Sequence, residues 1–124
     1  MWCMRRDAQR LQDIVVAADA VAAYLRQIGR EEFLTGGLAH DAILRQLTVA
    51  GEAVYKVSRG IRARHPEVPW GQIAGFRHRV VHDYFGLDLV ATWQFATVEL
   101  PLLREQAIAI IAVEFPMDAN STHK

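Results

Sequence analysis

The stretch Leu11-Gln12-Asp13-Ile14-Val15-Val16-Ala17-Ala18-Asp19-Ala20-Val21 decides the fold class of this chain. Its apolar residues recur at steps of three and four, and the spacing continues through Leu25 to Ile28. Such steps place side chains on one face of a helix with 3.6 residues per turn. We therefore predict a long amphipathic helix that ends at Gly29 in a left-handed stop.

A second helix is predicted from Leu38 or Asp41 to a point before His65-Pro66, because proline disfavours helix in the residue that precedes it. The segment Thr35-Gly36-Gly37 is the expected loop between the first two helices. The apolar stripe of the second helix comprises Ile43, Leu47, Ala50, Val54, Val57 and Ile61.

A third, shorter helix is predicted to begin at Pro69 or Trp70 and to end before Gly86. Four aromatic residues of this helix and the next are expected to belong to the core and not to stack on bases. They are Trp70, Phe76, Trp93 and Phe95.

The fourth helix is predicted to begin after Asp88, a suitable cap, and to carry an apolar seam from Trp93 to Ile111. Pro101 lies inside this seam. A proline in a helix interior removes one hydrogen bond and clashes with the preceding turn. A kink near Val98 to Pro101 is therefore expected, within one helix and not between two unrelated ones.

Composition agrees with one folded domain. Of the 124 residues, 52% are hydrophobic, and 14 basic residues balance 14 acidic ones, so net charge indicates no global attraction to nucleic acid. The chain shows no strand-like alternation, internal repeat or low-complexity linker. We predict an all-α bundle of four main helices over residues 1–115, followed by a disordered tail over residues 116–124.

Cysteine content and hydropathy bear on the compartment. Cys3 is the only cysteine, so no intrachain disulfide can form and nothing demands an oxidising environment. The first residues lack the apolar run of a signal peptide, and no stretch approaches the roughly 18 apolar residues of a membrane span. We expect a cytoplasmic protein without membrane association.

Charge is concentrated between Lys56 and His82. Six positive charges minus the one negative charge of Glu67 give this segment a local charge of +5. Such a band is typical of a solvated helix face and also suits phosphate binding, and both interpretations stay open. The basic residues are Lys56, Arg59, Arg62, Arg64, Arg77 and Arg79.

The run Phe76-Arg77-His78-Arg79-Val80-Val81-His82-Asp83-Tyr84 carries the candidate chemistry. Arg77 offers a permanently charged planar group that suits phosphate. His82 has the one side chain whose ordinary pKa, about 6.5, allows proton transfer near neutral pH. Together they indicate phosphodiester chemistry without a metal.

Helical geometry separates these two residues, since positions five apart lie about 140° around an ideal helix. The stem of Arg77 could reach back over one turn, the helix could loosen near Asp83, or a second copy of the chain could complete the site. We favour the second copy, because a two-fold axis would supply the other half of a cleft.

The run from Gly75 to Gly86, followed by Trp93 and Leu100-Pro101-Leu102-Leu103, resembles the HepT toxins of the HEPN superfamily. Their hallmark is an arginine, four to six residues, then a histidine, commonly with a tyrosine two positions on. The stretch from Arg45 to Ala53 is similar to the second-helix signature of that family. The resemblance extends from Asp7 to about Ala112.

This resemblance implies a small homodimeric endoribonuclease that uses neither a metal nor another cofactor and acts as the toxin of a toxin–antitoxin pair. Its partners would be the RNA substrate and a cognate minimal nucleotidyltransferase antitoxin of the MntA type, which silences the toxin by AMP transfer. Mapped by motif, Arg77 and His82 would cleave RNA and Tyr84 would receive AMP. The family often has asparagine directly after the arginine. Here His78 takes that place, either supporting the site or sharing proton transfer.

The expected mechanism follows from the residue types. His82 would abstract the ribose 2′-OH proton or protonate the leaving oxygen, while Arg77 offsets the charge that grows on the phosphate. The products would be a 2′,3′-cyclic phosphate and a 5′-OH. Glu52 either orients Arg77 or is an exposed helix carboxylate, and Asp83 is a second candidate partner of the arginine.

The sequence allows three other interpretations. His78 and His82 are four residues apart on one helix face, but a zinc site needs three or four ligands, and the chain offers only scattered His65, Asp83 or Asp88. We therefore expect no metal site. The main alternative is a non-catalytic HEPN helical module that binds nucleotide or a nucleotidyltransferase partner. The third is a purely structural dimer.

Overall fold

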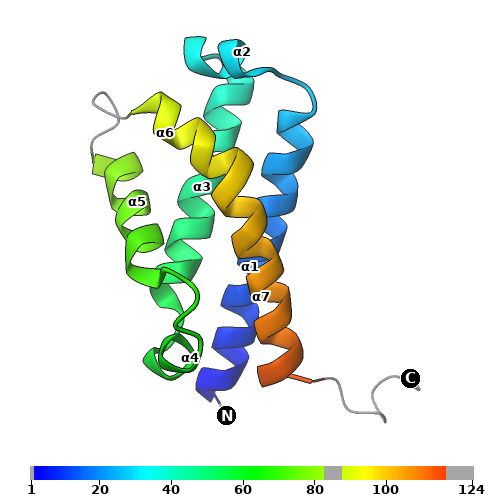
Figure 1. The fold of residues 1–124 in the computed structure, drawn as a ribbon, viewed down its shortest axis with the longest axis vertical. Helices are drawn as coiled ribbons and strands as arrows, with labels where there is room; N and C mark the ends of the chain where they lie inside the picture. The colour runs from blue at the N-terminus through cyan, green and yellow to red at the C-terminus, as the bar shows by residue number, and fades with distance from the viewer. Residues whose placement is uncertain (1, 83–87, 117–124) are drawn as a thin grey trace, which may run out of the picture.

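The computed structural model describes residues 2–82 and 88–116, with side chains described for residues 6–76 and 88–116. Over these residues the chain is helical without a strand, and four long helical segments run up and down the long axis (Figure 1). The predicted all-α bundle is confirmed. Its elements are α1 (Trp2–Leu25), α2 (Arg30–Thr35), α3 (Leu38–Lys56), α4 (Arg59–Arg64), α5 (Trp70–His82), α6 (Leu89–Gln94), the π-helical turn η2 (Phe95–Glu99) and α7 (Leu100–Glu114).

Helix α3 is central, because it packs against α1 on one side and against α5 on another, while α1 also packs against α7. All six residues of the stripe predicted for the second helix are buried. Burying one such aliphatic side chain contributes about 1.5–3 kcal/mol. The core also includes Leu11, Ile14, Phe33, Leu100, Leu103 and Ile110, each at most 2% exposed.

The end of the first helix differs from the prediction. Helix α1 ends at Leu25 and not at Ile28, and Gly29 is extended, with φ −91° and ψ 177°, so the predicted left-handed stop is wrong. Gly29 instead precedes the short helix α2, which the apolar spacing did not indicate. The reason is tertiary, since α2 delivers Phe33 into the core, where its side chain is fully buried.

The predicted loop at Gly36-Gly37 is confirmed. The two glycines have φ values of 94° and 108°, in a region that residues with a Cβ rarely adopt. They let the chain reverse between α2 and α3 within two residues.

The predicted second helix is interrupted. Helix α3 ends at Lys56, Val57 is extended with ψ 138°, and Ser58 caps the separate helix α4. The Ser58 N–H and hydroxyl donate to the two carboxylate oxygens of Asp7 at 2.9 and 2.6 Å, and its hydroxyl accepts from the Ile61 N–H at 3.5 Å. A carboxylate from α1 thus stabilises the break. Local spacing does not reveal such a contact.

The fourth helix begins as predicted. The Asp88 carboxylate accepts hydrogen bonds from the N–H groups of Val90 and Ala91, both at 3.1 Å, which satisfies two of the free donors of the first turn. The segment then continues through η2 to Glu114 without a loop and changes direction along its course (Figure 1).

The predicted distortion near Pro101 takes the form of the π turn. The Leu100 N–H donates to the Phe95 carbonyl, five residues back, in place of the carbonyl four residues back. Pro101 has no N–H and crowds the carbonyl of Thr97, and the Thr97 hydroxyl donates to the Trp93 carbonyl at 2.8 Å. Both effects favour the wider turn at this point.

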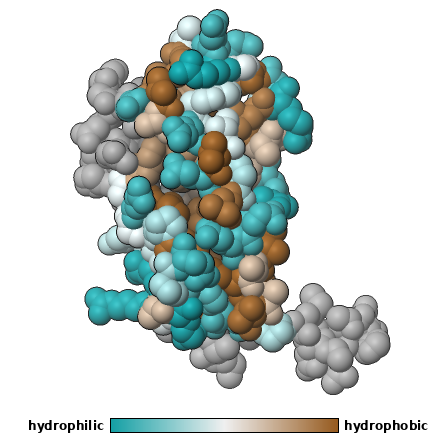
Figure 2. All heavy atoms as spheres, viewed as in Figure 1, coloured by the Kyte–Doolittle hydropathy of each residue, from teal (hydrophilic) through white to brown (hydrophobic). Residues whose placement is uncertain are grey.

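The last helical stretch carries apolar residues outside its seam as well. Apolar side chains lie among polar ones on the face crossed by α6 and α7 (Figure 2). The apolar side chains of this stretch are therefore less confined to one face than those of α3. Even so, none of the described helices is both long and apolar enough to span a bilayer. The exposed residues of the stretch include Val90, Val98, Leu102 and Val113, each at least 51% exposed.

The contact between Ser58 and Asp7 gives the first prediction. Replacing Ser58→Ala removes the cap of α4 and leaves the Asp7 carboxylate, which is 6% exposed, with a lost donor. We expect the free energy of unfolding to fall by about 1–3 kcal/mol in urea titrations. The control is Thr35→Ala, whose exposed hydroxyl donates to the Glu32 carbonyl within the same short helix. An equal loss in both variants would contradict the assigned role of Ser58.

Candidate active site

The predicted catalytic residues lie in the second half of α5. The helix is regular through His82, so the backbone positions of Arg77 and His82 are about 140° apart around it. A loosening near Asp83, one of the three options for joining the two residues, lies outside the described residues. The side chains of Arg77, His78 and His82 lie outside the described residues, as do Asp83 and Tyr84 entirely.

An aromatic pair holds the start of this segment. The Phe76 ring stacks on the Phe95 ring of η2, with centroids 4.6 Å apart and planes 11° apart. The two residues are 7% and 6% exposed. Because Phe76 directly precedes Arg77, this contact sets where the motif begins relative to the fourth helical segment. The prediction that Trp70, Phe76 and Phe95 are core residues is confirmed, while Trp93 is half-buried.

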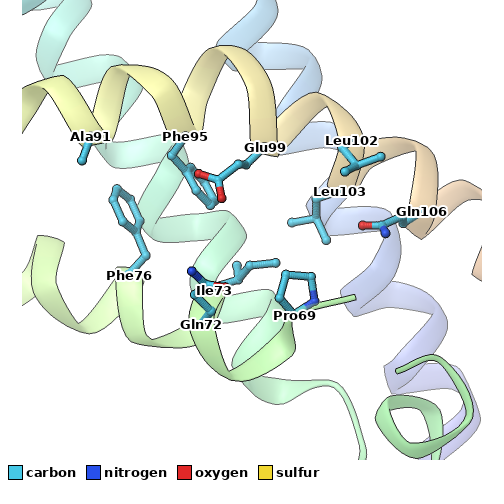
Figure 3. Close-up of a pocket in the computed structure, with 10 residues that line it drawn as sticks. All are labelled: Pro69, Gln72, Ile73, Phe76, Ala91, Phe95, Glu99, Leu102, Leu103 and Gln106. Carbon is cyan, nitrogen blue, oxygen red and sulfur yellow. The ribbon is translucent and has the colours of Figure 1, made fainter. Parts of the chain in front are cut away.

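A pocket of about 260 Å³ lies beside this pair, between α5 and the stretch from α6 to α7 (Figure 3). Its walls are largely apolar, with three polar side chains among them: Gln72, Glu99 and Gln106. Sequence reasoning missed this pocket. The available signal was Glu99, a charged residue four positions after Phe95 on an otherwise apolar row. The remaining lining residues are Pro69, Ile73, Phe76, Ala91, Phe95, Leu102 and Leu103.

Glu52, a candidate partner of Arg77, is half-buried on α3. Its carboxylate forms an ion pair with Lys56 at 3.3 Å, one turn along the same helix. Together with Arg10 and Asp13 of α1, it lines an open groove between α1 and α3. Its role towards Arg77 stays a prediction.

The basic band is partly neutralised. Besides Lys56, Arg64 is engaged, since its Nη2 and Nε atoms donate to the two carboxylate oxygens of Glu114 at 2.8 and 3.0 Å. Two of the four band residues with described side chains therefore pair with carboxylates. Lys56 and Arg64 therefore belong to an ion-paired surface, a third arrangement besides the solvated helix face and the phosphate site.

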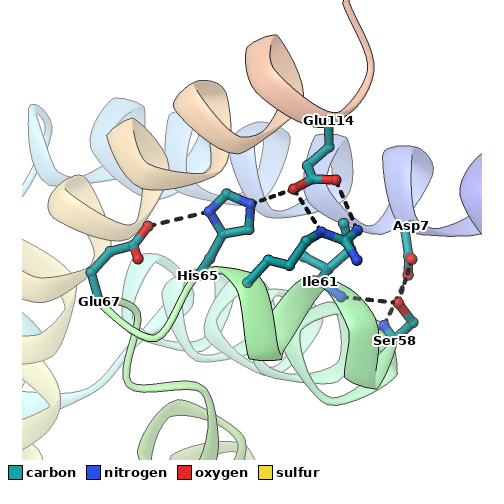
Figure 4. A network of polar contacts seen from close by, with 7 residues as sticks. Asp7, Ser58, Ile61, His65, Glu67 and Glu114 are labelled. Atoms are coloured by element: carbon teal, nitrogen blue, oxygen red, sulfur yellow. Dashed lines mark hydrogen bonds and ion pairs between the residues drawn. The ribbon is translucent and has the colours of Figure 1, made fainter.

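His65 joins the same network (Figure 4). Its ring nitrogens lie 2.8 Å from a Glu114 oxygen and 3.4 Å from a Glu67 oxygen, so the end of α7 is tied to the connection between α4 and α5. The Arg64 guanidinium, and then the His65 ring, lower the pKa of Glu114 from 4.5 to about 2. His65, one of the scattered residues weighed as further metal ligands, is thus held by carboxylates.

Comparison with known proteins identifies relatives over most of the chain. Residues 14–110 match the family described as "Ribonuclease HepT-like". A Methanocaldococcus jannaschii protein named "Putative RNase" is 33% identical over 111 residues, which cover 90% of this chain and 92% of the relative. A second protein of that organism with the same description is 34% identical over 101 residues, which cover 82% and 87%.

A third relative, "Probable ribonuclease HepT" of Thermococcus cleftensis, is 32% identical over 94 residues, which cover 76% of this chain and 86% of the relative. No solved structure matches the chain. The matched residues 14–110 include all of α5 and the run up to Tyr84.

The Glu114 network predicts a pH-dependent stability. Because the folded pKa of Glu114 is depressed, its charged form stabilises the protein above pH 4.5, and this contribution is lost as pH falls towards 2. Wild type should therefore exceed Glu114→Gln in unfolding free energy at pH 7, and the gap should narrow below pH 4.5. Urea titrations at several pH values measure this gap. The control is Glu105→Gln, which alters a carboxylate of α7 that is 68% exposed. A difference in unfolding free energy between wild type and Glu114→Gln that stays the same at every pH would contradict the network.

Proposed function

The chain belongs to the ribonuclease HepT-like family, and from this membership we propose that it is a metal-independent endoribonuclease, the toxin of a toxin–antitoxin pair. The observation that carries the proposal is the family match over residues 14–110, which contains the run from Arg77 to Tyr84. The proposed substrate is RNA, and the proposed site of action is the cytoplasm.

In the proposed mechanism, Arg77 binds the scissile phosphate and offsets the negative charge that develops on it. His82 takes the 2′-OH proton or gives a proton to the leaving 5′ oxygen, and such proton transfer contributes typically about 10²–10⁴-fold to a rate. The products are a 2′,3′-cyclic phosphate and a 5′-OH. His78, Asp83 and Glu52 are assigned supporting roles.

The active form is proposed to be a homodimer. The regular helix of α5 through His82 supports this, because one copy directs the backbone positions of Arg77 and His82 towards different sides. Two copies of α5 facing each other across a two-fold axis would bring Arg77 of one protomer towards His82 of its partner, twice per dimer.

The proposed antitoxin is a minimal nucleotidyltransferase of the MntA type that transfers AMP to Tyr84. This tyrosine comes two residues after His82. An added AMP places a negative phosphate close to the site that must receive the RNA phosphate, and repulsion together with bulk would block substrate.

The catalytic proposal predicts that His82→Ala and Arg77→Ala each lower RNA cleavage by about 100-fold or more. The assay is cleavage of a labelled RNA in EDTA, with thermal unfolding to show that each variant is folded. Unaltered cleavage in either variant would end the proposal. If wild type binds nucleotide but cleaves no RNA in EDTA, the non-catalytic module is favoured.

Mixing the two inactive variants tests whether the site is shared. After subunit exchange, half of the dimers contain one copy of each variant. If Arg77 and His82 of different protomers form one site, each mixed dimer regains one of its two sites, and the mixture has about a quarter of wild-type activity. If both residues of a site come from one protomer, the mixture stays inactive.

The inhibition proposal predicts that co-expression with the nucleotidyltransferase adds AMP to wild type and to Tyr55→Phe, but not to Tyr84→Phe. Tyr55 is the matched control, because its side chain is 57% exposed on α3. Intact mass and peptide mapping locate the group. Tyr84→Phe should escape growth rescue by the antitoxin, and AMP found on another residue would remove the role of Tyr84.

A further inference from the structure

The pocket between α5 and η2–α7 lies directly beside the motif. Phe76, which lines it, is followed by Arg77 on the same helix. The backbone position of the proposed phosphate-binding residue is therefore one residue from the pocket wall. At about 260 Å³ the pocket is smaller than the roughly 300–1,000 Å³ of sites for drug-sized molecules, so it suits one planar ring system.

The walls favour an aromatic ligand. The stacked rings of Phe76 and Phe95 lie on one part of the pocket, and Ile73 and Leu103 lie beside them (Figure 3). An apolar wall of this kind accepts the face of a base, and such contacts contribute about 1–3 kcal/mol per base. The side chains of this wall have no hydrogen-bond donor or positive charge for a ribose or a phosphate.

Three polar groups surround this apolar wall, one from each neighbouring element: Gln72 of α5, Glu99 of η2 and Gln106 of α7. The Glu99 carboxylate points between the two helical segments (Figure 3). Within the described part of the chain, no hydrogen bond or ion pair engages it. The Gln106 amide nitrogen reaches the Glu67 carbonyl only at 3.5 Å.

The π turn aims Glu99 into the pocket. On an α-helix, positions four apart drift about 40° per step, so a row that begins at Ala91 and Phe95 would rotate away from α5. A π turn advances less per residue, which brings Glu99 and Leu103 back to the same face. The distortion that Pro101 induces thus places a carboxylate in an apolar row that faces the motif helix.

The donor and acceptor pattern selects among the four bases. A carboxylate only accepts hydrogen bonds, and guanine alone has two adjacent N–H donors, N1–H and the N2 amine, for its two oxygens. Adenine and cytosine place an acceptor nitrogen beside their single amine, and uracil flanks its one N–H with carbonyls. The amides of Gln72 and Gln106 can donate to guanine O6 or N7.

We propose that this pocket binds a guanine base of the RNA next to the scissile phosphate, with Glu99 on its Watson–Crick edge, and so gives the enzyme a base preference. The inference rests on the proposed ribonuclease function. The rival occupant, an apolar side chain from a second copy, is disfavoured because it would help to bury the Glu99 carboxylate and bring no donor of its own.

Binding is tested first, on the full-length His82→Ala chain, by calorimetric titration with GMP, AMP, CMP and UMP. GMP should bind at least about tenfold more tightly than the other three. Adding Glu99→Gln should weaken GMP binding by about tenfold or more and should not weaken AMP binding, because a glutamine amide can both donate to adenine and accept from it. Adding Glu105→Gln, an exposed carboxylate outside the pocket, should change neither.

Cleavage by the chain with His82 intact provides the second measurement. Sites mapped on a random RNA should be enriched beside guanine, and Glu99→Gln should reduce the ratio of guanine-flanked to adenine-flanked cleavage, while Glu105→Gln keeps it. Cleavage without base preference, together with equal binding of the four nucleotides, overturns the pocket proposal and leaves the ribonuclease intact.

Two further outcomes separate this inference from the function on which it rests. Selective GMP binding that depends on Glu99, in a chain that cleaves no RNA, supports the pocket and rejects the nuclease. Light scattering measures the mass of the assembly. If Glu99→Gln changes that mass but not the base preference, the pocket is an interface with a second copy and the proposal is overturned.

Discussion

The burial of α3 on two sides is the constraint on which the rest of the structure depends. Its stripe must contact α1 and α5 at once, so the chain has to turn back sharply after Lys56 for α5 to return along it. The break at Val57 and the cap at Ser58 make that turn, and Asp7 of α1 holds it. One buried carboxylate thus joins the start of the chain to the corner that positions the motif helix.

The fourth helical segment illustrates how a local defect becomes a structural feature. Pro101 removes one backbone donor, and the resulting π turn keeps a row of residues from α6 to α7 directed at α5. That row supplies Phe95, which stacks on Phe76, and Glu99, an exposed residue that lines the pocket. A straight α-helix would have turned those side chains away from the motif.

The charges of the molecule fall into two groups with different roles. The sequence shows a band of +5 from Lys56 to His82, but the structure pairs Arg64 with Glu114 and Lys56 with Glu52. The paired part ties α7 to the α4–α5 connection and serves stability. Of the remaining band residues, Arg77 and Arg79 lie in the half of α5 that carries the proposed motif.

The sequence by itself determined the helical class, the Gly36-Gly37 loop, the Asp88 cap, the distortion before Pro101 and the motif that relates the chain to its family. Each of these follows from helical periodicity, turn chemistry or a short run of residue types, all of which act over a few neighbours. Only the tertiary structure decided that α1 stops at Leu25, that the second helix breaks at Val57 and that a pocket adjoins the motif. The first depends on the burial of Phe33, the second on the Asp7 carboxylate, 51 residues before Ser58, and the third on the packing of α5 near the stretch from α6 to α7. No local sequence pattern shows such contacts.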